Sequence, residues 1–202
     1  GGKMGKGRME AFSDGVIAVI ITIMVLELKT PHAATWQALL ANTPAFLSYV
    51  LSFMYVGLYW NNHHHLLHAA EKVDGRVLWA NLFFLFWLSL FPFVTSWVNE
   101  AEPIPASIPT ALYGGVLLMA AVAWMPLIHT LKCCNGGNDG VLGRALGGQR
   151  GDWKAKLSLV MYVTGIALAF WAPIFSCILY ALVAVMWIVP DRRIEHHLKQ
   201  HS

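Results

Sequence analysis

The chain has 202 residues, of which 57% are hydrophobic and only 12% are charged. Soluble domains carry about 25% charged residues, so this composition and a mean hydropathy of +0.54 indicate an integral membrane protein. The net charge of +3 comes from basic residues that are scattered rather than clustered. A scattered charge of this kind does not indicate a nucleic-acid partner, and we expect none.

The first apolar segment covers residues 8–30. A helix of this length spans roughly 33 Å, which is enough to cross a bilayer. On a helical wheel one narrow, mainly apolar stripe emerges, with Thr22 at its edge. The stripe consists of Arg8, Phe12, Gly15, Val19, Ile23 and Leu26. Asp14 lies on the far side and needs polar partners from its own bundle, because an ionisable group inside a membrane is energetically costly.

Five more apolar segments follow, so the sequence predicts an all-α integral membrane protein with six transmembrane helices over residues 8–190. The later helices are expected at about 44–69, 76–98, 110–131, 154–172 and 174–190. Pro92 is expected to kink the third helix. The glycine-rich residues 132–152 indicate a flexible linker. Residues 1–7 are expected to be a flexible leader, and residues 191–202 a cytoplasmic tail.

The basic residues orient this arrangement in the membrane. With the N-terminus inside, 13 of the 14 Lys and Arg residues fall on the cytoplasmic side, and only Lys29 falls outside. Cytoplasmic segments of membrane proteins carry an excess of Lys and Arg. The sequence therefore predicts a multi-pass protein with both termini in the cytoplasm.

The stripe on the first segment has two interpretations. An apolar stripe alone is most often a packing face of a helix. Here the Thr22 hydroxyl lies beside it at membrane depth, and hydrophobic constrictions gate some pores by excluding water. A hydroxyl next to such a constriction can share in replacing an ion's hydration shell. A single helix cannot enclose a pore, so this interpretation requires several copies around a symmetry axis.

The polar start of the first segment, RMEAFSDG, contains the motif R-x-x-x-F-S-D. It resembles the signature of the transmembrane protein 175 family, which comprises the lysosomal potassium channels and their bacterial homologues. The end of that segment, VLELK, is also typical of the family. Trp60 to His64 is similar to its W-x-x-H-H element, and Asn81 and Pro92 stand where its third helix carries an Asn and a Pro.

The resemblance implies a homotetramer in which the first helix of each subunit lines a central pore. It places the pore constriction at Val19, Ile23 and Leu26, and assigns potassium selectivity to Thr22. The family often has Ile or Leu where Val19 stands, which leaves open which ring is narrowest. We expect Phe12 and Gly15 to line the cytoplasmic vestibule.

The resemblance also implies a polar network that holds the pore helix in place. In the family, the Ser and Asp of the signature bond to a His and an Asn on neighbouring helices. The residues expected to brace the helix are Arg8, Phe12, Ser13, Asp14, Trp60, His63, His64 and Asn81.

Together these features predict a passive, potassium-selective channel of a prokaryotic plasma membrane, whose partners are its own copies, the lipid bilayer and potassium ions. No cofactor, metal or catalytic residue is expected. The chain has no T-V-G-Y-G-like filter and no regularly spaced arginines of a voltage sensor.

Two other functions are compatible with parts of the sequence. A proton-coupled secondary cation transporter would use Asp14 and the histidines as a relay. A metal-dependent membrane enzyme would use the histidines, since His64 and His68 have the i, i+4 spacing of a metal-binding pair. The remaining histidines supply too few ligands for a two-iron site.

Overall fold

The computed structural model of the chain describes residues 5–146 and 149–188, and within these ranges every regular element is a helix. Residues 1–4, 147–148 and 189–202 lie outside the described ranges, and the predicted tail lies among them. The elements are α1 (Lys6–Leu26), α2 (Trp36–Ala41), α3 (Thr43–Ala69), α4 (Gly75–Ser89), α5 (Phe91–Glu100), α6 (Ser107–Cys134), α7 (Val141–Leu146), α8 (Gln149–Leu168) and α9 (Pro173–Ile188).

All six apolar segments found in the sequence fall on helices. Three helical stretches are long and apolar enough to cross a membrane: α1, the pair α4 and α5, and α6. Helix α9 is apolar but shorter, whereas α3 and α8 are long but less apolar. The all-helical membrane architecture is therefore shown, and the count of six spans stays a prediction.

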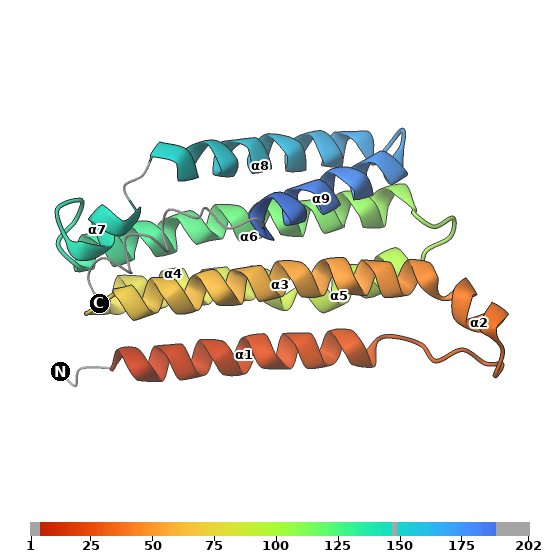
Figure 1. Cartoon of the computed structure of the whole chain (residues 1–202), viewed down its shortest axis with the longest axis horizontal. Helices are drawn as coiled ribbons and strands as arrows, with labels where there is room; N and C mark the ends of the chain where they lie inside the picture. The colour runs from red at the N-terminus through yellow and green to blue at the C-terminus, as the bar shows by residue number, and fades with distance from the viewer. Residues whose placement is uncertain (1–4, 147–148, 189–202) are drawn as a thin grey trace.

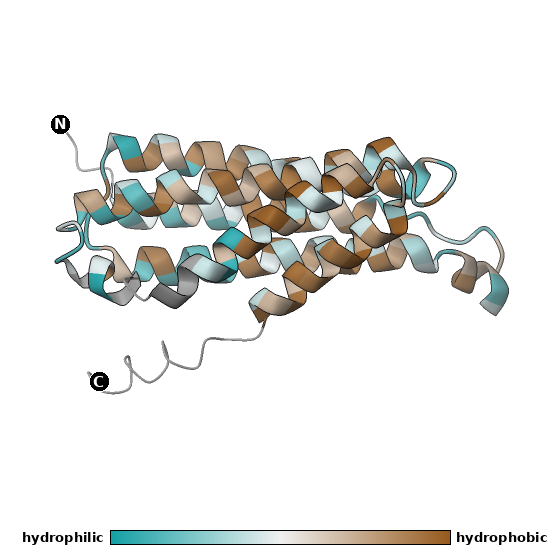
Figure 2. Cartoon of the chain, turned by 90° about the horizontal axis from the view of Figure 1, so that it is seen from above, coloured by the Kyte–Doolittle hydropathy of each residue, from teal (hydrophilic) through white to brown (hydrophobic). Residues whose placement is uncertain are grey.

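The helices form an elongated bundle in which α1 and α8 lie at opposite edges (Figure 1). Helix α6 packs against α4, α5, α8 and α9, and α1 packs against α3, α4 and α5. Hydrophobic residues run along the helices, while most hydrophilic ones gather at the two ends of the bundle and in the connections (Figure 2).

The boundaries of α1 differ from the expected ones at both ends. The helix begins at Lys6, so Lys6 and Gly7 belong to it rather than to the leader. It ends at Leu26, four residues before the predicted end, with the N–H of Glu27 still bonded to the carbonyl of Ile23.

The predicted kink at Pro92 corresponds to a one-residue interruption between α4 and α5, which together form one apolar stretch. Helix α4 ends at Ser89 and α5 begins at Phe91, with Leu90 between them. Proline has no N–H, and its ring clashes with the carbonyl four residues earlier.

Asp74 caps the start of α4 by accepting the N–H of Val77 at 3.0 Å. That bond, and a second one from Arg76, lower the pKa of Asp74.

The glycine-rich segment that was expected to be a linker is partly helical. Helix α6 continues to Cys134, and Gly136 and Gly137 follow with φ of +89° and +66°, a region that favours glycine. The Asn135 side chain donates to the carbonyl of Lys72 at 3.0 Å and accepts two backbone N–H groups, those of Glu71 and Lys72. Asn135 thereby ties the end of α6 to the α3–α4 connection.

Helices α6, α8 and α9 approach closely around Tyr180, which is 1% exposed. Its hydroxyl donates to the carbonyl of Thr110 at 3.4 Å. A Cβ on Gly114 would overlap this hydroxyl and lie 2.9 Å from Cγ1 of Ile166. A Cβ on Gly165 would lie 2.5 Å from the Tyr180 ring. The two glycines therefore make room for the tyrosine.

We expect Gly114→Ala to lower the thermal stability of the detergent-solubilised protein, because overpacking costs about 1–3 kcal/mol. Gly115→Ala is the matched control: no atom lies within 4 Å of a Cβ there. Its melting temperature should stay unchanged or rise slightly, because Ala favours a helix. Equal melting temperatures for the two variants would contradict this view of the α6–α9 contact.

Candidate functional site

Helix α1 has one buried face and one exposed face. The buried face carries Met9, Ser13, Ile17, Ile20 and Met24. On the other face the four large apolar members of the predicted stripe are exposed: Phe12 by 53%, Val19 by 56%, Ile23 by 41% and Leu26 by 75%. The residues predicted to line a pore thus share the face that the rest of the subunit leaves uncovered.

Thr22 and Gly15 lie on the same exposed side of α1. The Thr22 hydroxyl donates to the carbonyl of Ala18 at 2.9 Å. Because its proton is directed along the helix, the oxygen's remaining lone pairs are available to a cation or water. A Cβ atom at position 15 would have no neighbouring atom within 4 Å, so no other part of the subunit fills the space beside Gly15.

Among the three membrane-capable stretches, α1 is the least covered by its own subunit. Only 28% of its most apolar window is buried, against 50% for α4 with α5 and 39% for α6. A helix at the edge of a bundle with a mainly apolar exposed face has to meet lipid or another protein surface.

The buried face of α1 is held by a chain of hydrogen bonds among three buried side chains. His63 Nε2 and Asn81 Oδ1 are 2.8 Å apart, and Asn81 Nδ2 donates to Ser13 Oγ at 2.9 Å. Ser13 Oγ donates in turn to the carbonyl of Met9 at 2.8 Å. Because the NH₂ group of Asn81 donates to Ser13, the atom of Asn81 that faces His63 is the amide oxygen, which can only accept a hydrogen bond. His63 therefore carries a proton on Nε2. All three side chains are at most 1% exposed.

A second contact joins the signature aspartate to α3. Trp60 Nε1 donates to Asp14 Oδ1 at 3.0 Å, and the indole stacks on the ring of His64 with centroids 6.1 Å apart. His64 Nδ1 lies 3.5 Å from Glu10 Oε1. The aspartate therefore bonds to a tryptophan, rather than to the histidine or asparagine that the family signature implies.

Two members of the expected bracing set stand apart from this network. Arg8 and Phe12 are exposed, and Arg8 has no polar partner among the described residues. Sequence analysis missed Lys6 and Glu10. Lys6 Nζ donates to the carbonyl of Ala70 at 2.8 Å and lies 3.3 Å from that of His68. The last four carbonyls of a helix have no helical partner, and a basic side chain is a usual donor to them, but the sequence does not show which lysine supplies it.

The opposite end of α1 is held by exposed contacts. Ser96 Oγ donates to Glu27 Oε2 at 3.1 Å, and Lys29 Nζ pairs with Glu100 Oε1 at 2.8 Å. The side chains of that ion pair are 71% and 50% exposed, so it contributes little to stability.

The histidines of α3 do not assemble a metal centre within residues 5–146 and 149–188. His64 and His68 stack with ring centroids 6.1 Å apart, but no group of three His, Cys, Asp or Glu side chains in these ranges is placed to hold an ion. His64 instead lies beside Trp60 and Glu10, and His63 contacts Asn81 and Phe84 of α4.

Comparison with known proteins identifies the family to which the chain is similar. Residues 8–92 match the family model described as endosomal/lysosomal potassium channel TMEM175, a range that includes the exposed stripe and every member of the Ser13–Asn81–His63 chain. A potassium channel of Chryseobacterium sp. (strain P1-3) is 48% identical over 198 residues, which cover 98% of this chain and all of the relative. The chain belongs to the TMEM175 family.

Solved and more distant TMEM175 relatives extend the comparison. The crystal structure of a lysosomal potassium-selective channel TMEM175 homolog from Chamaesiphon minutus has a TM-score of 0.74 at 25% identity, covering 91% of this chain and 96% of that one. The endosomal/lysosomal proton channel TMEM175 of Gallus gallus is 28% identical over 137 residues, which span 58% of this chain but only 27% of the larger relative.

Proposed function

We propose that this TMEM175 family member is a potassium-selective channel whose pore is lined by α1 at the centre of a homotetramer. The observation that carries the proposal is the division of α1 into two faces. One face is fixed to α3 and α4 by buried hydrogen bonds, and the other presents Val19, Ile23 and Leu26 to whatever lies beyond the subunit. Four such faces around an axis enclose a pathway, which a single subunit cannot do.

In this proposal the stripe residues form stacked rings. Val19, Ile23 and Leu26 supply apolar rings that exclude water where they are narrow, and Phe12 and Gly15 line the wider vestibule before them. An ion passes when the rings are wide enough for it to keep part of its hydration shell. Flow is passive, and no residue of the chain has a catalytic role.

Thr22 supplies the polar ring between the apolar ones. Its hydroxyl oxygen has free lone pairs because its proton bonds back to Ala18. Four such oxygens replace part of the water around a potassium ion more readily than around a sodium ion, which holds its water more tightly. The selectivity in this proposal comes from side chains and needs no filter of backbone carbonyls.

The proposed setting is the plasma membrane of a prokaryote, with six spans and both termini in the cytoplasm. The connections of the chain support it, because they alternate between the two ends of the bundle (Figure 1). The α3–α4 connection, the last turn of α6 and the segment after it lie at the end where α1 begins, and they hold Lys72, Lys132 and Arg144. The excess of basic residues there is the one expected of a cytoplasmic face.

The test is recording from purified protein in planar bilayers, with potassium on one side and sodium on the other. We expect unitary currents that reverse toward the potassium equilibrium potential. In Thr22→Ala the reversal potential should move toward zero, because the hydroxyl ring is lost. Thr22→Ser, which keeps the hydroxyl, should reverse near the wild-type potential.

Two outcomes would reject parts of the proposal. If Thr22→Ala and wild type reverse at the same potential, Thr22 does not set selectivity. If no unitary currents appear and flux assays show slow exchange in fixed proportion to protons, the protein is a proton-coupled transporter and the α1 stripe is a packing face.

A further inference from the structure

The connection between α1 and α3 carries a short helix that the bundle does not cover. Helix α2 has no buried residue, and its large apolar side chains are among the most exposed of the chain: Trp36 by 80%, Leu40 by 68% and Leu39 by 52%. It projects from the end of the bundle at which α1 ends and α3 begins (Figure 1). Trp36 and Leu40 are four positions apart, so they share one helix face.

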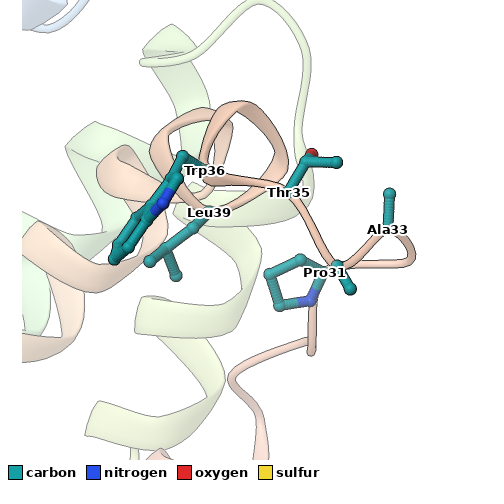
Figure 3. A pocket seen from close by; sticks show the side chains of 6 residues that line it. Pro31, Ala33, Thr35, Trp36 and Leu39 are labelled. Atoms are coloured by element: carbon teal, nitrogen blue, oxygen red, sulfur yellow. The ribbon is translucent and has the colours of Figure 1, made fainter.

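This exposed apolar surface continues into the first turn of α3. Phe46 is 56% exposed and Leu47 is 60% exposed. Beside α2 the chain forms an open hollow of about 420 Å³, lined by Pro31, Trp36, Leu39 and three small residues of the preceding loop (Figure 3). In Figure 3 the Trp36 and Leu39 side chains lie side by side against the ribbon of α2.

The whole segment is also free of charge. No Asp, Glu, Lys or Arg occurs between Lys29 and Glu71. The other connection at this end, between α5 and α6, contrasts with it because it contains Glu102. A loop that faced only water would have no reason to expose a tryptophan and two leucines without an accompanying charge. Tryptophan flanked by apolar residues is instead characteristic of the boundary between headgroups and acyl chains.

The segment is attached to the end of α1. Asn42 Nδ2 donates to the carbonyl of Lys29 at 2.7 Å, so the end of α2 is fixed to a residue three positions beyond Leu26, the last residue of α1. Thr35 caps α2 by accepting the N–H of Ala38 at 3.2 Å. Any surface that holds α2 therefore also holds the end of α1 that carries Leu26.

We propose that α2 and the first turn of α3 lie in the interfacial layer of the membrane and contact lipid directly, so that α2 anchors the end of α1 to the bilayer. The lipid is recognised by apolar burial of Trp36, Leu39 and Leu40 near the headgroups, without a charged contact, so the anchor does not require anionic lipid. Only the assignment of this end to the outer leaflet rests on the proposed function.

The test is depth-dependent quenching of a fluorophore on α2. Cys133, Cys134 and Cys177 are replaced by Ala, Leu40→Cys is labelled with an environment-sensitive dye, and the full chain is reconstituted in phosphatidylcholine vesicles. Glu102→Cys, on the charged connection at the same end of the bundle, is the matched control. We expect spin-labelled lipid to quench the dye at residue 40 several times more strongly than at residue 102, and aqueous iodide to show the reverse order.

Other results would overturn the proposal. Strong quenching by iodide at both positions would place α2 in water. A blue-shifted dye at residue 40 that neither quencher reaches would show that protein covers α2, as in a contact with a second copy of the chain. If the cysteine variants do not fold, brominated lipid is applied to the wild type and to Trp36→Phe. Equal quenching of these two proteins would reject the lipid contact at Trp36. None of these measurements needs ion conduction, so failure of the channel proposal would leave them interpretable.

Discussion

Ile23→Asn should give unitary currents several-fold larger than those of the wild type. Ile23 is the middle one of the three proposed constriction residues, one helical turn from both Val19 and Leu26, and its side chain is 41% exposed in the subunit. If four copies meet there, the four Ile23 side chains form a narrow apolar ring that excludes water. An ion then crosses the ring with little of its hydration shell, which is energetically costly. An amide at the same position keeps water in the ring, which lowers that barrier.

The control for this variant is on the same helix. Val25 is also exposed, by 44%, but it lies on a different side of α1 from the stripe, so Val25→Asn adds the same amide away from the proposed axis. Its unitary current should match that of the wild type. Equal currents in all three proteins, at equal amounts of folded protein, would show that Ile23 does not line the pathway.

Asn81→Ala should destabilise the subunit by about 1–3 kcal/mol, the cost of leaving buried polar groups without partners. Asn81 lies between Ser13 and His63, and its loss removes a hydrogen bond from each of them. Neither group can turn to solvent, since both are fully buried. We expect a lower melting temperature in detergent and, because α1 loses its tie to α4, less uniform unitary currents.

Asn61→Ala is the comparison, because Asn61 is exposed and has no polar partner among the described residues. The melting temperature of the Asn61→Ala variant should equal that of the wild type. A double-mutant cycle with Ser13→Ala separates the bond itself from the loss of packing. We expect a coupling of about 0.6 kcal/mol and at most about 1.7 kcal/mol, the average and the maximum for hydrogen bonds between membrane helices. A coupling near zero would mean that the Asn81–Ser13 contact does not hold α1.

Within residues 5–146 and 149–188, each long helix coincides with an apolar segment of the sequence, and long apolar segments are what a membrane requires where a chain crosses it. The stripe on α1 was also visible in the sequence, since a period of 3.6 residues separates Val19, Ile23 and Leu26 from Ser13 before any neighbour is known. What these residues face outside the subunit does not follow from periodicity, and their role in a pore stays a prediction.

Tertiary partners were harder to predict. The sequence indicated that Asp14 needs a polar partner, but only the crossing of α1 and α3 selects the Trp60 indole for it. Lys6 lies among glycines at the start of the chain, where no periodic pattern predicts a partner for its side chain. Its bonds to two carbonyls depend on where α3 ends. Helix α2 is too short for a periodic signal, and it depends instead on the Thr35 cap.

The two ends of α1 are held by polar contacts of unequal kind, so a tilt of the helix that kept the buried bonds near Ser13 would move the other end. Around Ser13 the polar contacts are buried and mutually dependent, whereas beyond Leu26 they are exposed: a surface ion pair, the bond from the Ser96 hydroxyl and the bond from Asn42 to the carbonyl of Lys29. The 13 residues between these points span roughly 20 Å, so a tilt of about 5° would displace Leu26 by roughly 1.7 Å while Ser13 stays in place. In the proposed tetramer, small rotations of this kind would change the spacing of the Leu26 side chains most and that of the Phe12 side chains least.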